Sequence, residues 1–132
     1  HKQTRQPLSF EILAGSTVQQ RLMASFVSDL AKLGIAARLR VVDSAQYQSR
    51  LKDYDYDMIQ TAWPSSLSPG NEQVFRWDSR TADTPGSFNF VGVKNPAVDA
   101  MIKRLLEAKD DQDFTSAVRA LDRVLLSGHY VI

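Results

Sequence analysis

The chain has 132 residues, is 43% hydrophobic and contains no cysteine. This length and composition suit one globular domain with its own core, and the lack of cysteine excludes disulfides, thiolate nucleophiles and cysteine-type zinc sites. Lysine and arginine together number 16 against 15 acidic residues, giving a net charge of +1. Because no long block of like charge occurs, we expect no nucleic-acid partner.

The first half of the chain alternates predicted strands and helices. A period-two apolar pattern predicts a strand over 8–14, and Ser16 with Gln19 has capping-box spacing before a helix that ends at Gly34. That helix has an apolar face made of Val18, Leu22, Phe26, Leu30 and Leu33. Further along, the pattern predicts a strand over 35–41, a short helix from Asp43 to about Leu51 and a strand over 54–63, centred on 58–62.

This order predicts an α/β fold with a small, mainly parallel sheet (β-α-β-α-β) flanked by helices. The three strands would then end together at 15–16, 43–44 and 63–64. Ligands of open parallel sheets bind outside the carboxyl ends of the strands. We therefore expect a binding site at this edge.

The segment 62–95 is the longest stretch without a strong helix or strand pattern. Structureless loops of more than about 12–15 residues are usually functional or disordered, and aromatic residues argue against disorder. This segment contains Trp63, Trp77, Phe88 and Phe90. We interpret it as an ordered binding loop, with a short helix over 69–77 and a brief extended piece over 86–93.

Two amphipathic helices are predicted after the loop. Asn95 caps the first, which begins at Pro96, and the second follows Asp110 and Asp111 and ends at Gly128. Residues 128–132 resemble the start of a strand, and residues 1–7 are polar and uncapped. We therefore expect a fragment of a longer protein, with 1–7 a linker or hinge remnant and 8–132 a single ligand-binding lobe.

Motifs for common chemistries are incomplete. Asp53, Asp55 and Asp57 match the start of a calcium loop, but Met58 and Pro64 stand where glycine and a bidentate glutamate are needed. The glycine and serine at 15–16 could bind an anion, yet they lack a phosphate-binding motif, so a capped helix start is favoured.

Covalent catalysis also lacks its usual residues. Serine nucleophiles normally need a histidine base, and the two histidines stand at the chain ends, at 1 and 129, so we expect no serine hydrolase. The glutamates at 11, 72 and 107 lie in separate elements. We expect no catalytic site, metal or cofactor.

Within the loop, Trp63 leaves the predicted binding edge, and we favour a ligand contact for it. Trp77 is equally compatible with the core and with a ligand. Neutral donors and acceptors come from Ser65, Ser66, Ser68, Asn71 and Gln73. For Ser65 and Ser68, turn formation explains the residue type equally well.

Several runs resemble a known family in order and spacing. These are 42–47 (VDSAQY), 54–58 (YDYDM) leading to Trp63, 63–73 with its SPGNEQ ending, 86–89 (GSFN) and 95–99 (NPAVD). Together they resemble the carboxyl-terminal lobe of the periplasmic oligopeptide and dipeptide solute-binding proteins of ABC importers, closest to the YejA-like branch.

The resemblance implies one lobe of a periplasmic-binding-protein type II fold, monomeric and not enzymatic. It implies capture of an oligopeptide or peptide-like compound in the periplasm and delivery to an inner-membrane ABC permease. In many relatives an aspartate shortly after the tryptophan pairs with the peptide amino terminus, whereas 64–68 contains no acid here. The expected ligand contacts are Trp63, Ser66, Asn71, Gln73 and Asn89, with Glu72 as a possible charge partner.

Two alternatives remain open. A flavodoxin-like or nucleotide-binding enzyme domain fits the alternation of strands and helices, but it would lack a phosphate loop. A receiver-like interaction domain would need clustered acids at strand ends, where only Asp43 qualifies.

Overall fold

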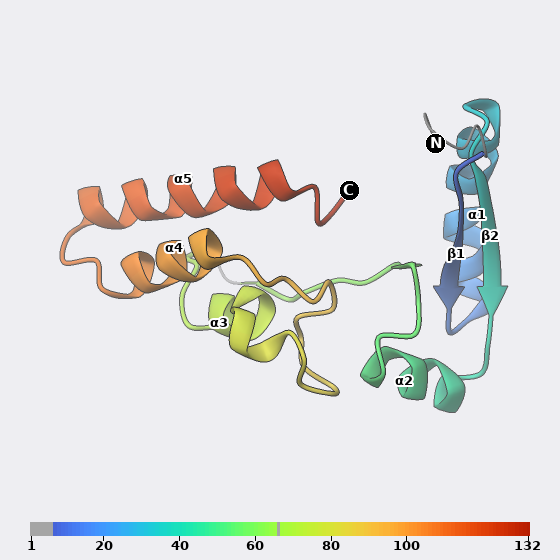
Figure 1. Cartoon of the computed structure of the whole chain (residues 1–132), viewed down its shortest axis with the longest axis horizontal. Helices are drawn as coiled ribbons and strands as arrows, with labels where there is room; N and C mark the ends of the chain where they lie inside the picture. Colours follow the sequence, from blue (N-terminus) through green and yellow to red (C-terminus); the bar gives the residue numbers. More distant parts are fainter. Residues whose placement is uncertain (1–6, 66) are drawn as a thin grey trace. The chain divides into compact units, whose positions relative to one another are not determined.

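The computed structural model describes residues 7–65 and 67–132 and divides into two compact units (Figure 1). The first unit ends at Trp63, and the second runs from Pro64 to Ile132. The first contains a sheet and two helices, whereas the second is formed from helices and irregular segments.

A three-stranded parallel sheet organises the first unit. Its strands are β1 (Ser9–Ala14), β2 (Ala36–Val41) and β3 (Met58–Ile59), arranged in the order β2-β1-β3. The pairing of β1 with β2 runs from Ser9↔Ala36 to Ala14↔Val41, and β3 pairs at Ile12↔Met58 and Leu13↔Ile59. The predicted parallel sheet is thus confirmed. Ile12, Leu13 and Ala14 are its buried core because β1 lies between the other two strands.

The third strand is much shorter than the 54–63 predicted from sequence. Asp57 Oδ2 accepts a hydrogen bond from the backbone N–H of Glu11 at 2.8 Å, and Gln19 Nε2 donates to the carbonyl of Gln60 at 3.3 Å. A side chain therefore satisfies one backbone group of β1 beside the start of β3 and one backbone group just after the end of β3. A two-residue strand consequently suffices, and the chain is free to leave the sheet soon after Ile59.

Helices α1 (Thr17–Lys32) and α2 (Ser44–Lys52) begin at the predicted caps. Ser16 Oγ accepts from the N–H of Gln19 at 3.2 Å, and Asp43 Oδ1 accepts from that of Gln46 at 2.8 Å. Gly34 has a φ of +75°, a left-handed conformation that glycine adopts without strain and that ends α1.

The apolar face predicted for α1 is only partly correct. Helix α1 packs against β2, and its half-buried apolar residues are Met23, Phe26, Val27 and Leu30. Val18, Leu22 and Leu33 are instead exposed. A helix lying on one narrow sheet covers a stripe narrower than its whole apolar face, which explains the difference.

A charged cluster joins β1, α2 and the turn before β3. Arg50 donates to Glu11 Oε1 at 3.0 Å and to Asp55 Oδ2 at 2.7 Å, and its side chain is only 17% exposed. Charge-assisted hydrogen bonds of this kind are stronger than neutral ones. Arg50 therefore fixes α2 and the following turn to the central strand.

Replacing Arg50 with methionine is expected to lower the free energy of unfolding by about 1–2 kcal/mol, because Glu11 and Asp55 lose their shared donor. Chemical denaturation of the 132-residue chain measures this. The control is Lys52→Met on the exposed side of the same helix, which should change stability by less than about 0.5 kcal/mol. Equal effects of the two substitutions would contradict the role assigned to Arg50.

The second unit contains α3 (Glu72–Trp77), a 3-10 turn η1 (Ser79–Thr81), α4 (Pro96–Leu106) and α5 (Asp111–Gly128). The last two helices pack on each other (Figure 1). Helix α4 begins at its predicted cap, where Asn95 Oδ1 accepts from the N–H of Ala97 at 3.0 Å. Helix α5 begins at Asp111, one residue before the predicted start, because Asp110 Oδ1 accepts from the N–H of Asp113 at 2.8 Å. The core contains Trp77, Ala82, Val93, Val98, Ile102, Leu105, Ala117 and Leu121.

Two local predictions in this unit are wrong. Residues 86–93 form turns in place of an extended piece, and 128–132 form no strand within the described chain. The N–H of Gly92 bonds to the carbonyl of Asn89 at 2.9 Å, which closes a turn that a strand would not allow. His129 has a left-handed φ of 52° and ends α5.

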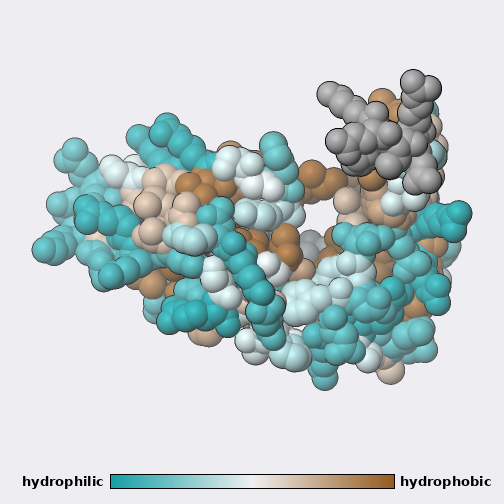
Figure 2. All heavy atoms as spheres, viewed as in Figure 1, coloured by the Kyte–Doolittle hydropathy of each residue, from teal (hydrophilic) through white to brown (hydrophobic). Residues whose placement is uncertain are grey.

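The visible surface over α2 is largely hydrophilic (Figure 2), in keeping with the exposure of most of its side chains. Across the described ranges of both units, no helix is long and apolar enough to cross a membrane.

Candidate functional site

The predicted contact residues lie in the irregular segment that follows β3. Trp63 is half-buried and is the last residue of the first unit. Asn71, Glu72 and Gln73 follow one another at the start of α3 in the second unit. Ser66 lies outside the described residues. The structure thus places three of the six predicted residues together, on one turn of chain.

Glu72 is held at the segment by its own neighbours. Its Oε1 accepts from the N–H of Gly70 at 2.9 Å and from Nε2 of Gln73 at 3.2 Å. The N–H groups of Gly70 and of Glu72 itself are the main reason that the pKa of this carboxyl lies below its ordinary value, with smaller contributions from Gln73 and the charge of Arg76. The side chain therefore carries a fixed negative charge at neutral pH.

The two neighbours of Glu72 differ in burial and in the hydrogen bonds that their side chains make. Asn71 is exposed and makes no side-chain capping hydrogen bond to α3. Gln73 is half-buried, and its amide donates to Glu72. Asn71 can offer a donor and an acceptor to a ligand, whereas Gln73 also orients the carboxylate.

The sequence analysis did not predict a role for Arg76, yet this residue holds Pro64 and Ser65 in place. Its guanidinium donates to Ser65 Oγ at 2.8 Å and to the carbonyl of Pro64. Its position four residues after Glu72, on the same helix face, is the feature of the sequence that could have indicated a role for it. Both ends of the 64–70 stretch are therefore fixed to α3 by side chains.

Asn89 does not offer its polar atoms to a ligand in this geometry. The residue is fully buried; its Nδ2 donates to the carbonyls of Asp78 at 3.3 Å and Val93 at 3.2 Å, and its Oδ1 accepts from the N–H of Val93 at 2.9 Å. Each polar atom of the amide is thus bonded to backbone. The prediction of direct ligand contact is not supported here, because the side chain instead maintains the turns of 86–93.

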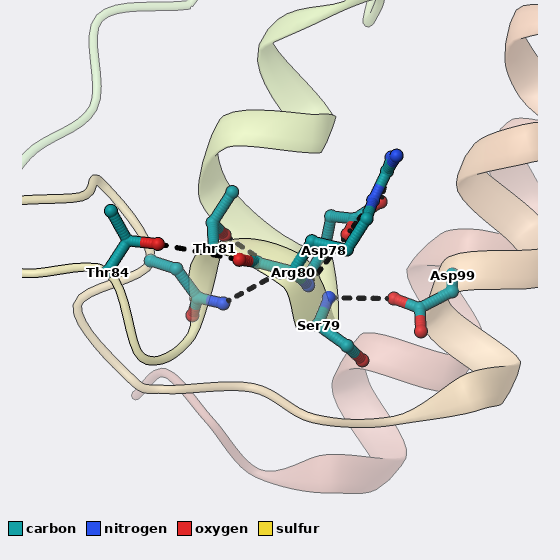
Figure 3. Close-up of polar contacts among 7 residues, drawn as sticks. Asp78, Ser79, Arg80, Thr81, Thr84 and Asp99 are labelled. Carbon is teal, nitrogen blue, oxygen red and sulfur yellow. Dashed lines mark hydrogen bonds and ion pairs between the residues drawn. The ribbon is translucent and has the colours of Figure 1, made fainter.

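The buried Asp78 anchors the turn that follows α3 (Figure 3). Its carboxylate accepts from the N–H and the guanidinium of Arg80, at 2.8 Å in each case, and these bonds to Arg80 hold its pKa below the ordinary value. Asp99 of α4 accepts from the N–H of Ser79 at 2.9 Å. This network ties η1 to α4.

Asn89→Ala is expected to destabilise the chain by about 2–4 kcal/mol, because it leaves several buried backbone groups without partners. Thermal and urea denaturation measure the loss. The matched control is Asn71→Ala at an exposed position, which should cost less than about 0.5 kcal/mol. A near-neutral Asn89→Ala variant would show that the amide does not maintain these turns.

Trp77 and two of the three acids of the calcium-like motif make contacts within the fold. Trp77 is buried in the core of the second unit, which decides the open choice for that residue. Of the calcium-like acids, Asp55 contacts Arg50 and Asp57 contacts the backbone of β1. Over residues 7–65 and 67–132, no three His, Asp or Glu side chains group in a way that could hold a metal ion.

Residues 1–85 match the model of the bacterial extracellular solute-binding proteins, family 5 Middle. The match includes the first part of the irregular segment 62–95. The chain belongs to this family. Solute binding is the family's role, and its architecture is that of the periplasmic binding proteins of type II.

The chain is similar to several curated proteins of this group. It is 54% identical over 129 residues to a Brucella melitensis protein described as a binding protein, covering 98% of this chain and 21% of that protein. It is 49% identical to the peptidoglycan-binding protein YepA (95% and 20%) and 43% identical to the probable peptide-binding protein YejA (98% and 21%), both of Agrobacterium fabrum. The chain thus spans about a fifth of the length of these relatives.

Solved structures share the fold at low sequence identity. NikZ of Campylobacter jejuni, solved with Ni(L-His), superposes with a TM-score of 0.79 at 16% identity, covering 93% of this chain and 25% of NikZ. The oligopeptide-binding protein AppA of Bacillus subtilis, solved with a nonapeptide, gives 0.75 at 18% identity, covering 93% and 24%. These likenesses confirm the predicted type II fold.

Proposed function

We propose that this family 5 chain is part of the ligand-binding lobe of a periplasmic substrate-binding protein that captures oligopeptides or peptide-like compounds for an ABC importer. The observation that carries the proposal is family membership over residues 1–85, which include the segment from Trp63 to Gln73. Similarity to the relatives named for peptide and peptidoglycan binding supports the ligand class.

We further propose that residues 8–132 form one ligand-binding lobe of a longer, two-lobed, monomeric protein, with 1–7 as a linker or hinge. Binding is then enclosure and release without covalent chemistry, followed by transfer to an inner-membrane permease. Backbone hydrogen bonds to an extended peptide would give affinity while pockets tolerate different side chains. The segment 64–73 suits this role because side chains of α3 hold Pro64 and Ser65 at one end and Gly70 near the other, which lowers the entropy lost on binding.

The proposed ligand contacts are Trp63, Ser66, Asn71, Glu72 and Gln73. Trp63 supplies apolar surface for stacking, and the neutral residues supply donors and acceptors. Glu72 is the proposed partner of a ligand ammonium, since it is the one acid between 64 and 73 and its charge is stabilised by Gly70. A serine could not compensate an ammonium removed from water as a carboxylate does.

A peptidoglycan-derived peptide is the second candidate ligand. The observation that favours it is the 49% identity to the peptidoglycan-binding protein YepA, which exceeds the identity to the YejA relative. Native mass spectrometry of the full-length parent protein, with fragmentation of any co-purified compound, distinguishes the two. Ordinary peptides would favour the first ligand and amino-sugar or D-amino-acid compounds the second, while a ligand-free protein that ignores both would contradict peptide binding.

Trp63→Ala in the full-length parent should weaken peptide binding at least tenfold, measured by isothermal titration calorimetry, because the ligand loses an aromatic surface. The control is Phe75→Ala, an exposed aromatic outside the proposed contacts, which should leave affinity within twofold. Circular dichroism checks that both variants are folded. Unchanged affinity in a folded Trp63→Ala protein would remove this residue from the site.

Glu72→Gln should weaken binding of a tripeptide with a free amino terminus about tenfold and leave its N-acetylated form within twofold, because only the free amine carries a positive charge. Fluorescence or calorimetric titration of both peptides measures this. Glu107→Gln, which removes the charge of an exposed glutamate at the C-cap of α4, is the control for net charge. An equal loss for the two peptides would show that Glu72 shapes the segment without pairing with the amine.

A further inference from the structure

Arg76 differs from every other described cation in its surroundings. Only Arg50 and Arg76 are half-buried among the lysines and arginines of residues 7–65 and 67–132, the others being exposed. Arg50 forms ion pairs with Glu11 and Asp55. No ion pair joins Arg76 to a carboxylate of the described residues, and residues 1–6 and 66 contain no acidic side chain.

The partners that Arg76 does have are neutral. Its two terminal nitrogens donate to Ser65 Oγ and to the carbonyl of Pro64. A guanidinium has five N–H donors, so this arrangement leaves three, including the one on Nε. Because no buried side-chain nitrogen in the described chain lacks a partner, Nε of Arg76 is accessible to solvent.

Holding Pro64 and Ser65 in place does not by itself require a positive charge. An uncharged amide donor could satisfy a hydroxyl and a carbonyl equally well. Glu72, one turn away on α3, feels the charge of Arg76 but forms no ion pair with it, since the Glu72 carboxylate accepts from Gly70 and Gln73. The segment therefore presents a preoriented cation whose remaining donors have the fork geometry that matches a carboxylate.

We propose that Arg76 is a specificity-determining residue that binds a carboxylate of the ligand, supplied by its terminus or by an acidic side chain. This inference rests on the proposed function, because it assigns the substrate class of the same segment. Pro64 and Ser65 hold the guanidinium in position, and the free donors bind the incoming anion. Glu72 and Arg76 then give the segment opposite charges one helical turn apart, each held by separate neighbours.

The test uses the full-length parent protein and four tripeptide probes. Trialanine is compared with trialanine amide, and Ala-Glu-Ala amide with Ala-Gln-Ala amide, so each pair differs in a single carboxylate. Affinities are measured by calorimetry for the wild type, Arg76→Gln, Arg76→Lys and Arg119→Met. Arg119 is an exposed arginine of α5, so its variant controls for the loss of one positive charge.

For at least one pair, the wild type should bind the acid more than tenfold better than its neutral partner. Arg76→Gln should reduce that preference to less than threefold while changing affinity for the neutral partner by less than threefold. Arg76→Lys should keep part of the preference, and Arg119→Met all of it.

Two results would overturn the inference. Wild-type binding without preference in either pair excludes carboxylate recognition, and equal losses for acid and neutral probes in Arg76→Gln show that Arg76 only positions 64–65. In both cases peptide binding itself survives. If the wild type binds none of the four probes and also ignores a mixed peptide pool, the proposed function fails, and this inference fails with it.

Discussion

The polar backbone groups of a long irregular segment must find hydrogen-bond partners, and this constraint shapes much of the molecule. Helices and sheets satisfy such groups by repetition, but the chain between β3 and α4 has little regular structure. Side chains take over the task. Asn89 bonds the backbone of 78 and 93, Asp99 that of 79, Arg76 that of 64 and Glu72 that of 70.

The need for backbone hydrogen-bond partners also explains why β3 is short and where the irregular segment begins. Asp57 and Gln19 satisfy the backbone next to β3, so the strand can stop after two residues. The chain then leaves the carboxyl end of a parallel strand, where ligands of open sheets bind. A longer β3 would use residues 60–63 in the ladder and leave fewer for recognition.

The charges of the segment are organised differently from those of the scaffold. Outside the stretch 64–76, the half-buried Arg50 and the buried Asp78 are paired with opposite charges of the same unit, and the half-buried Asp99 accepts from the backbone N–H of Ser79. In the segment, Glu72 and Arg76 bond to neutral groups and form no ion pair with each other within the described chain. The ion pairs of Arg50 and Asp78 thus add stability locally, whereas Glu72 and Arg76 are the charges that we propose to meet a ligand.

Local patterns were enough to predict the regular elements and the family. Caps at Ser16, Asp43 and Asn95 depend on residues two or three positions apart, so the sequence alone determined where three helices begin. The alternation of strands and helices determined the parallel sheet, because short crossovers leave few other topologies. The order of weak motifs along the chain determined the resemblance to the solute-binding proteins.

Only the tertiary structure decided which polar residues serve the fold and which remain for a ligand. Asn89 and Asn71 are the same residue type in the same predicted loop, yet one is buried among backbone groups and the other is exposed. Arg76 and Arg50 are likewise indistinguishable by local pattern; Arg76 bonds to Ser65, 11 positions away, and Arg50 to Glu11, 39 positions away. Hydrogen-bond partners so distant in sequence are set by packing, which no local periodicity encodes.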